Sequence, residues 1–133
     1  MTYRTEIVPI DSLHQHEQVI ADRLAKVAEI IIREQCVDIP VVVDEKTRVI
    51  LDGHHRYNAL IKLGAKKVPA ILIDYFDNSL ITVEARHESG LKGITKKEVI
   101  DMGLSDKVFN PKTTRHKLKF TIERINVPLE ELM

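Results

Sequence analysis

The run of residues 49–60 constrains the fold more than any other part of this chain. It opens with the apolar residues Val49, Ile50 and Leu51, which are typical of a buried strand. Asp52 and Gly53 follow, and the apolar residues after them have the spacing of a helix that Gly64 would end. The sequence therefore predicts a strand that passes directly into a helix, as in α/β domains.

The rest of the chain supplies further elements of both kinds. Helical spacing of apolar residues predicts a long helix over 17–34. The capping-box pattern from Thr95 to Glu98 predicts a short helix through Met102 that Gly103 would stop, and Pro128 would open a final helical turn. Apolar and β-branched runs predict strands over 5–10, 40–43, 48–51, 68–73, 80–85 and 116–122, with 40–43 and 48–51 forming a hairpin. We expect a small mixed sheet with flanking helices.

Length and composition fit one globular domain over residues 1–133. Hydrophobic residues make up 44% of the chain and charged residues 30%, an ordinary globular balance. No secretory signal is visible at the start, and the apolar runs are too short to span a bilayer. The single cysteine, Cys36, excludes an internal disulfide and a cysteine-based zinc site. We expect a cytoplasmic protein without a membrane segment.

Charge is balanced over the chain but not along it. The formal net charge is zero, which argues against nucleic acid as a partner. Residues 92–124, however, contain nine Lys or Arg and four Asp or Glu. This local excess of positive charge is typical either of a solvated face or of the wall of an anion site.

The strand-to-helix turn at Asp52 and Gly53 has the chemistry of an anion site. Glycine lets a ligand approach the backbone closely, and the first N–H groups of a helix point outward unpaired. His54, His55 and Arg56 occupy the same first turn. Arginine offers a bidentate fork for phosphate oxygens, and histidine offers hydrogen bonds in a neutral or a charged state. Because positive side chains oppose the helix dipole here, a bound phosphate would remove a local conflict.

Two further clusters are candidates for binding or catalysis. One follows Pro111 and is typical of a loop that binds a carboxylate or a phosphate: Lys112, Thr113, Thr114, Arg115 and His116. Glu17 is expected in the first turn of the long helix, where it would either favour the dipole or act as a general base. His14 and His16 have i, i+2 spacing, a signal too weak to predict a metal site.

Taken together, these residues resemble a known family. The strand–Gly–x–x–Arg–helix unit followed by a second apolar strand resembles the nucleotide-binding domain of the ParB/sulfiredoxin superfamily. The run Asp52-Gly53-His54-His55-Arg56, combined with His16-Glu17 and Thr113-Thr114-Arg115-His116, looks most like the free-serine kinases. The resemblance covers about residues 7–116. It implies transfer of a phosphoryl group from ADP or ATP to the hydroxyl of L-serine, giving O-phosphoserine, with Mg²⁺ on the nucleotide.

The resemblance also implies a role for each cluster. Glu17 matches the carboxylate that takes the serine hydroxyl proton, and Asp52 and His55 match residues beside the transferred group. The turn residues match the phosphate-binding site of the nucleotide: Asp52, Gly53, His54, His55 and Arg56. The third cluster matches the loop that holds the serine carboxylate or the product phosphate: Thr113, Thr114, Arg115 and His116. No metal ligand is expected from the protein, and the oligomeric state stays open.

Two other readings of the same turn are weaker. A ParB-type module would respond to nucleotide and control a partner, but partition proteins carry a second arginine in this turn and an added helix-turn-helix domain. Sulfiredoxin-like repair would need a cysteine where this chain has His54. The nucleotide-responsive module is therefore the alternative to the kinase.

Overall fold

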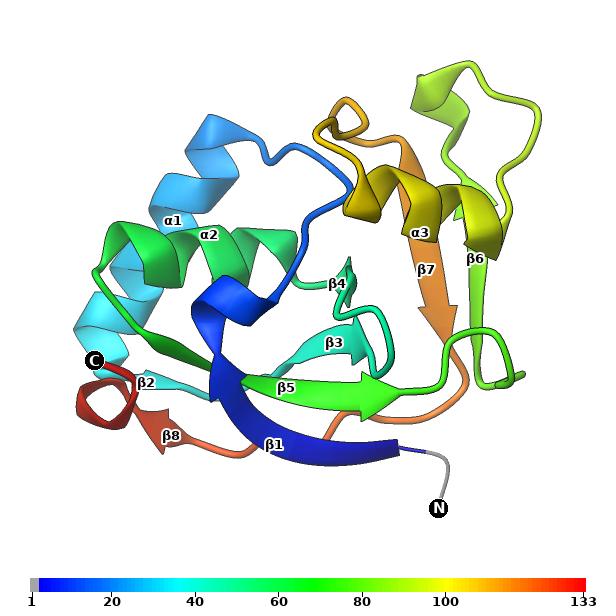
Figure 1. Ribbon diagram of the computed structural model, residues 1–133. Coiled ribbons are helices and arrows are strands. Elements are labelled where there is room, and N and C mark those ends of the chain that lie inside the picture. Colours follow the sequence, from blue (N-terminus) through cyan, green and yellow to red (C-terminus); the bar gives the residue numbers. More distant parts are fainter. Residues whose placement is uncertain (1–2) are drawn as a thin grey trace.

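A four-stranded mixed sheet forms the base of the structure, a computed structural model that describes residues 3–133 (Figure 1). Its strand order is β1-β5-β3-β4, in which only β3 and β5 pair in parallel. The strands are β1 (Tyr3–Pro9), β3 (Val41–Asp44), β4 (Ile50–Asp52) and β5 (Lys67–Ile73). The mixed sheet with flanking helices confirms the predicted fold class, and the antiparallel β3 and β4 confirm the predicted hairpin.

Helices cover both faces of this sheet. Helices α1 (Ala21–Glu34) and α2 (His54–Lys62) pack against each other on one face, and α3 (Lys96–Leu104) lies on the other, with β4 between them (Figure 1). Each face has its own cluster of buried side chains, because alternate residues of a strand point to opposite faces. One cluster contains Val43 with Ala28 and Leu60, and the other contains Val42 with Val99.

Two short ribbons and three 3-10 turns complete the chain. Strand β6 (Ile81–Ala85) pairs antiparallel with β7 (Thr114–Leu118) beside α3, as Figure 1 shows. Strand β2 (Cys36–Val37) pairs with β8 (Val127–Pro128) through two residue pairs, and no sequence pattern predicts this pairing. The 3-10 turns are η1 (Ile10–Ser12), η2 (His87–Ser89) and η3 (Leu129–Leu132), the last of which confirms the helical turn predicted after Pro128.

The long helix begins four residues later than its periodicity predicts. The segment before Ala21 is extended, and it forms isolated bridges from His14 to Val49 and from Glu17 to Phe109. Glu17 therefore does not lie in the first turn of a helix, and that prediction is wrong. Val19 and Ile20 are half-buried, so they satisfy the apolar pattern without being helical.

Two other predicted boundaries are also wrong. Thr114, Arg115 and His116 belong to β7 rather than to a loop, because the strand runs from Thr114 to Leu118 instead of over 116–122. Helix α3 has the predicted capping box at Thr95 and Glu98, but it continues through Gly103 to Leu104. Gly103 is buried against Val49 and so serves packing rather than termination.

Within residues 3–133, none of the helices combines the length and the apolar character that a membrane crossing requires.

The contact between α3 and Val49, the residue before β4, predicts a stability effect at Gly103. A Cβ atom there would lie 2.5 Å from Val49 Cγ1, and Val49 is fully buried. We expect Gly103→Ala to lower the free energy of unfolding by about 1–2 kcal/mol, because overpacking outweighs the better helix propensity of alanine. Urea unfolding measures this change. Gly93→Ala is the control, since nothing lies within 4 Å of its added Cβ, and equal losses in both variants would contradict the packing argument.

Candidate functional site

The three predicted clusters converge on one cavity of about 350 Å³ above β4. Its walls come from the segment before α1, the first turn of α2, and the start of β7. Five cationic side chains line it: Arg23, Arg56, Arg86, Lys112 and Arg115. The carboxylates in the lining are Glu17 and Asp52. Such an excess of positive charge favours an anionic ligand.

Most of the predicted site residues reach this cavity. The lining includes Glu17, Asp52, Gly53, His54, His55, Arg56, Thr114, Arg115 and His116. Thr113 is absent from the lining; its side chain is buried and donates a hydrogen bond to the Asn110 carbonyl at 2.7 Å. Thr113 therefore shapes the turn before β7 rather than contacting the cavity.

Gly53 makes the close turn from β4 into α2. It is the N-cap of α2, and its φ of 98° lies in the left-handed region that glycine tolerates. A Cβ atom there would lie 2.7 Å from Val41 Cγ1 and 2.9 Å from Arg56 Nη2, so a side chain does not fit. No side chain caps the helix, and Asp52 is exposed at the end of β4. The first N–H groups of α2 therefore meet the cavity without a side-chain cap.

His54 and His55 are held through their Nε2 atoms. The backbone N–H of His16 donates to His54 Nε2 at 3.2 Å, and the backbone N–H of Ile20 donates to His55 Nε2 at 3.1 Å. A backbone amide can only donate, so both Nε2 atoms carry no proton and both rings are neutral with Nδ1–H. Burial lowers the pKa of His54 well below 6.5, and burial together with Arg23 and Arg56 lowers the pKa of His55.

Arg56 carries the fixed positive charge of this turn. Its Nη2 donates to the Pro40 carbonyl at 3.3 Å, while its buried Nε has no hydrogen-bond partner within the described part of the chain. Burial lowers the pKa of Arg56 from its ordinary value, and Asp52 and Asp38 act in the opposite direction. Arginine nevertheless stays protonated in proteins. Its charge therefore remains at the helix N-terminus, where an anion would be favourable.

Glu17 is held across the cavity by Thr114. Both the backbone N–H and the hydroxyl of Thr114 donate to Glu17 Oε1, each at 2.8 Å. The other carboxylate oxygen takes part in neither bond, and the side chain is only half-buried. One oxygen of Glu17 is thus fixed by β7 while the group as a whole lines the cavity.

His16 lies next to the contact between Glu17 and Thr114. Its Nδ1–H donates to the Ile50 carbonyl at 2.7 Å, and its Nε2 lies 3.0 Å from the Thr114 hydroxyl oxygen. The side chain is 1% exposed, and burial lowers the pKa of His16 to about 4. Its ring packs edge-on against that of His54. His16 is therefore a neutral part of the support for Glu17 and β4.

His116 also has a hydrogen bond at its Nε2 atom, in this case with a tyrosine. The Tyr75 hydroxyl lies 2.8 Å from His116 Nε2. Burial raises the pKa of Tyr75, so the phenol keeps its proton, and burial lowers the pKa of His116 to about 3. His116 is therefore a neutral ring in the cavity wall. Tyr75 was not found from the sequence. It follows β5, and no residue near it in the sequence indicates that it contacts a distant histidine.

Arg23 and Arg86 were also missed by sequence reasoning. Arg23 lies on the exposed side of the first turn of α1, where it reads as an ordinary solvated charge. Arg86 follows β6, and its Nε donates to the Thr114 carbonyl at 3.1 Å. Neither falls within the basic stretch over 92–124 that the charge pattern singled out. Only the fold brings them to the cavity wall.

A protein-borne metal site finds no support in residues 3–133. No group of three or more His, Cys, Asp or Glu side chains there is arranged to hold a metal ion. His14 is exposed, whereas His16 is buried, with its Nδ1 bonded to the Ile50 carbonyl and its Nε2 3.0 Å from the Thr114 hydroxyl oxygen, so the two do not face a common ion.

The cavity lies in a small α/β domain whose fold is shared with proteins of known structure. The structure superposes on that of a free serine kinase in complex with AMP with a TM-score of 0.85, at 21% identity, covering 97% of this chain and 93% of that one. At this identity the likeness establishes the shared fold. No protein-family model matches the chain.

Similar sequences include both kinds of protein that the motifs suggest. An ATP-dependent L-serine kinase of Staphylothermus marinus is 41% identical over 78 residues, which are 56% of this chain and 31% of that protein. An ADP-dependent L-serine kinase of Thermococcus kodakarensis is 31% identical over 77 residues, 55% of this chain and 32% of that protein. A ParB-like protein of Sulfolobus acidocaldarius is 44% identical over 73 residues, 55% of this chain and 36% of that protein.

These relatives confirm the resemblance to the ParB/sulfiredoxin superfamily and, within it, to the serine kinases. The chain matches about a third of the length of each of the three.

The buried histidines predict that acid destabilises the fold. The folded-state pKa values of His16, His54 and His116 lie below the 6.5 of an unperturbed histidine. As the pH falls below 6.5, the unfolded chain binds protons that the folded chain does not, so the free energy of unfolding decreases toward about pH 4 and is greatest above 6.5. We expect a loss on the order of 1 kcal/mol per histidine per pH unit in this window.

Urea unfolding at about pH 7.5 and about pH 5 measures this dependence. His116→Gln keeps an acceptor for Tyr75 but removes one titrating group, so its dependence should be shallower. His87→Asn, at an exposed position, should leave the dependence unchanged. Equal free energies of unfolding at the two pH values would contradict the assignment of these histidines as neutral.

Proposed function

We propose that this protein transfers a phosphoryl group from a nucleotide to the hydroxyl of free L-serine, giving O-phospho-L-serine. The observation that carries the proposal is Glu17, a carboxylate held on one side by Thr114 and facing a cation-lined cavity at the N-terminus of α2. The similarity to L-serine kinases over more than half of the chain supports it. Phosphoryl transfer depends chiefly on positioning and charge neutralisation, which this cavity offers.

The nucleotide phosphates are proposed to bind at the turn from β4 into α2. The uncapped N–H groups after Gly53 and the charge of Arg56 both favour phosphate oxygens there. Arg23, Arg86 and Lys112 extend the positive wall. These groups would offset the charge that spreads over the phosphoryl oxygens during transfer.

Serine is proposed to bind between Glu17 and β7. Glu17 would accept the proton of the serine hydroxyl as its oxygen forms the bond to phosphorus and the nucleotide leaves. Arg115, at the start of β7, is the cation suited to the serine carboxylate, and neutral His116 lines the same wall. Thr114 acts by holding Glu17, and Thr113 supports the turn rather than the substrate.

Magnesium would be carried by the nucleotide. Asp52 is the one carboxylate besides Glu17 in the lining, which fits an ion that keeps most of its ligands as phosphate oxygens and water. When bound, Mg²⁺ would neutralise phosphate charge. The donor is either ADP or ATP, since kinases of both kinds are among the similar proteins. Cytoplasmic residence, predicted from the sequence, fits these substrates and stays a prediction.

A nucleotide-responsive module without turnover is the second candidate. Its support is the similarity to a ParB-like protein. It would bind nucleotide at the same turn but would give no reason for a carboxylate fixed opposite that turn. Cys36 lies in β2 and is absent from the cavity lining, so sulfiredoxin-like chemistry is not proposed.

The kinase proposal predicts the effect of removing the base. With Mg²⁺, L-serine and ADP or ATP, the wild-type protein should form O-phosphoserine, followed by phosphorus NMR. Glu17→Gln should lower kcat by about 10²–10⁴-fold with little change in nucleotide affinity. Glu29→Gln, at an exposed position on α1, is the matched control and should keep full activity.

The outcomes separate the two candidates. Nucleotide binding by the wild type without product from either donor would reject the kinase and favour the binding module. Product formed equally well by Glu17→Gln would keep the kinase but remove Glu17 as its base.

A further inference from the structure

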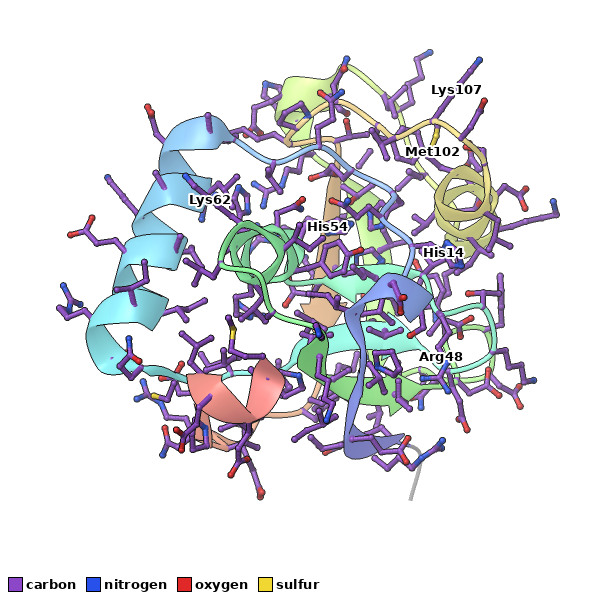
Figure 2. All side chains as sticks on the ribbon, turned by 60° about the vertical axis from the view of Figure 1, so that its left-hand side comes forward. His14, Arg48, His54, Lys62, Met102 and Lys107 are labelled. Carbon is purple, nitrogen blue, oxygen red and sulfur yellow. The ribbon has the colours of Figure 1, made fainter. Side chains whose placement is uncertain are left out.

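Two adjacent histidines hold the backbone on both sides of Glu17. The amides of His16 and Ile20, which flank it in the sequence, donate to Nε2 of His54 and of His55, respectively. In Figure 2, His54 lies between α2 and the segment that carries His14. The first turn of α2 is thus bonded directly to the segment of the proposed base.

These bonds limit what the histidines can offer a phosphate. A ring nitrogen that accepts from a backbone amide has its lone pair occupied and carries no proton. Neither Nε2 can then donate to a phosphate oxygen, and neither ring can be cationic while the bond lasts. The arginine and lysine side chains of the lining are free of this restriction, because none of them needs to lose a proton or a partner to meet an anion.

The segment of Glu17 is extended rather than helical, and it is attached to the fold at several other points. The His14 backbone bonds to those of Arg48 and Ile50, the Gln18 N–H donates to the Phe109 carbonyl, and the Phe109 N–H donates to the His16 carbonyl. Thr114 fixes the carboxylate from β7. Asn58 of α2 donates to the Gln15 side chain at 2.6 Å, and the two histidines add bonds from α2 to the backbone on both sides of Glu17.

We propose that His54 and His55 are positioning residues that fix Glu17 relative to the first turn of α2 through their Nε2 atoms, which leaves only their Nδ1–H groups for a phosphate. The consequence for catalysis rests on the proposed function, in which Glu17 is the base. The attachment itself does not, because it exists in the protein without substrate. A base must lie within hydrogen-bond reach of the proton it takes, so a small displacement of this segment would slow turnover.

His55 offers the sharper test, because it is less buried than His54 and its substitution is less disruptive. Asparagine is too short to reach the Ile20 amide, whereas glutamine places a carbonyl oxygen near the position of Nε2. We expect His55→Asn to raise the hydrogen-exchange rate of the Ile20 amide by about tenfold, as loss of one hydrogen bond implies, and His55→Gln to restore it. His87→Asn, an exposed histidine outside the cavity, is the control.

Kinetics and nitrogen NMR complete the test. His55→Asn should lower kcat by about tenfold while the nucleotide Kd changes by less than about threefold, and His55→Gln should recover kcat. The ¹⁵N signals of wild-type His54 and His55 should show an unprotonated Nε2 in both rings. His54→Gln should likewise keep the His16 amide protected.

Three results would overturn the proposal: an Ile20 amide unchanged in His55→Asn, a protonated Nε2 in wild-type His55, or a raised nucleotide Kd with unchanged kcat. A wild type that phosphorylates no serine would reject the proposed function instead. The exchange and nitrogen data would still decide whether the two histidines hold the segment.

Discussion

The turn at Gly53 is the constraint on which the rest of the structure depends. It passes a buried strand into α2 with a positive φ and no space for a side chain against Val41. This places the uncapped N-terminus of α2 at the edge of β4, and it aims His54 and His55 at the extended segment before α1. The start of α2, the position of the segment that carries Glu17 and the shape of the cavity therefore all depend on one residue that must be glycine.

Charge in the cavity is divided between two kinds of side chain. His54 and His55 are neutral because backbone amides occupy their Nε2 atoms, and burial disfavours the charged ring in them and in His116. The positive charge comes from arginine and lysine, of which Arg56 is the one buried at the helix N-terminus. The conflict with the helix dipole that three basic residues would create is thus reduced to Arg56 alone.

Sequence motifs correctly predicted the elements that are formed by residues close together in the chain. The apolar run, the glycine and the helical spacing over 49–60 gave β4, the turn and α2, and the capping box at Thr95 was confirmed. The placement of Glu17 was wrong because Val19 and Ile20 continue the helical period while packing from an extended segment. Its real partners, Phe109 and Thr114, are distant in sequence. Tyr75 and Arg86 were missed for the same reason: their roles depend on β6 and β7 pairing beside β4, which no periodicity encodes.

The central claim is that a phosphoryl group crosses this cavity to an acceptor held at Glu17. A crystal structure of Glu17→Gln with nucleotide, Mg²⁺ and L-serine tests it most directly. The account predicts phosphates at the N-terminus of α2 and a serine hydroxyl within about 2.6–3.2 Å of the residue 17 side chain. Nucleotide bound at that turn with serine elsewhere, or phosphates bound away from α2, would contradict it.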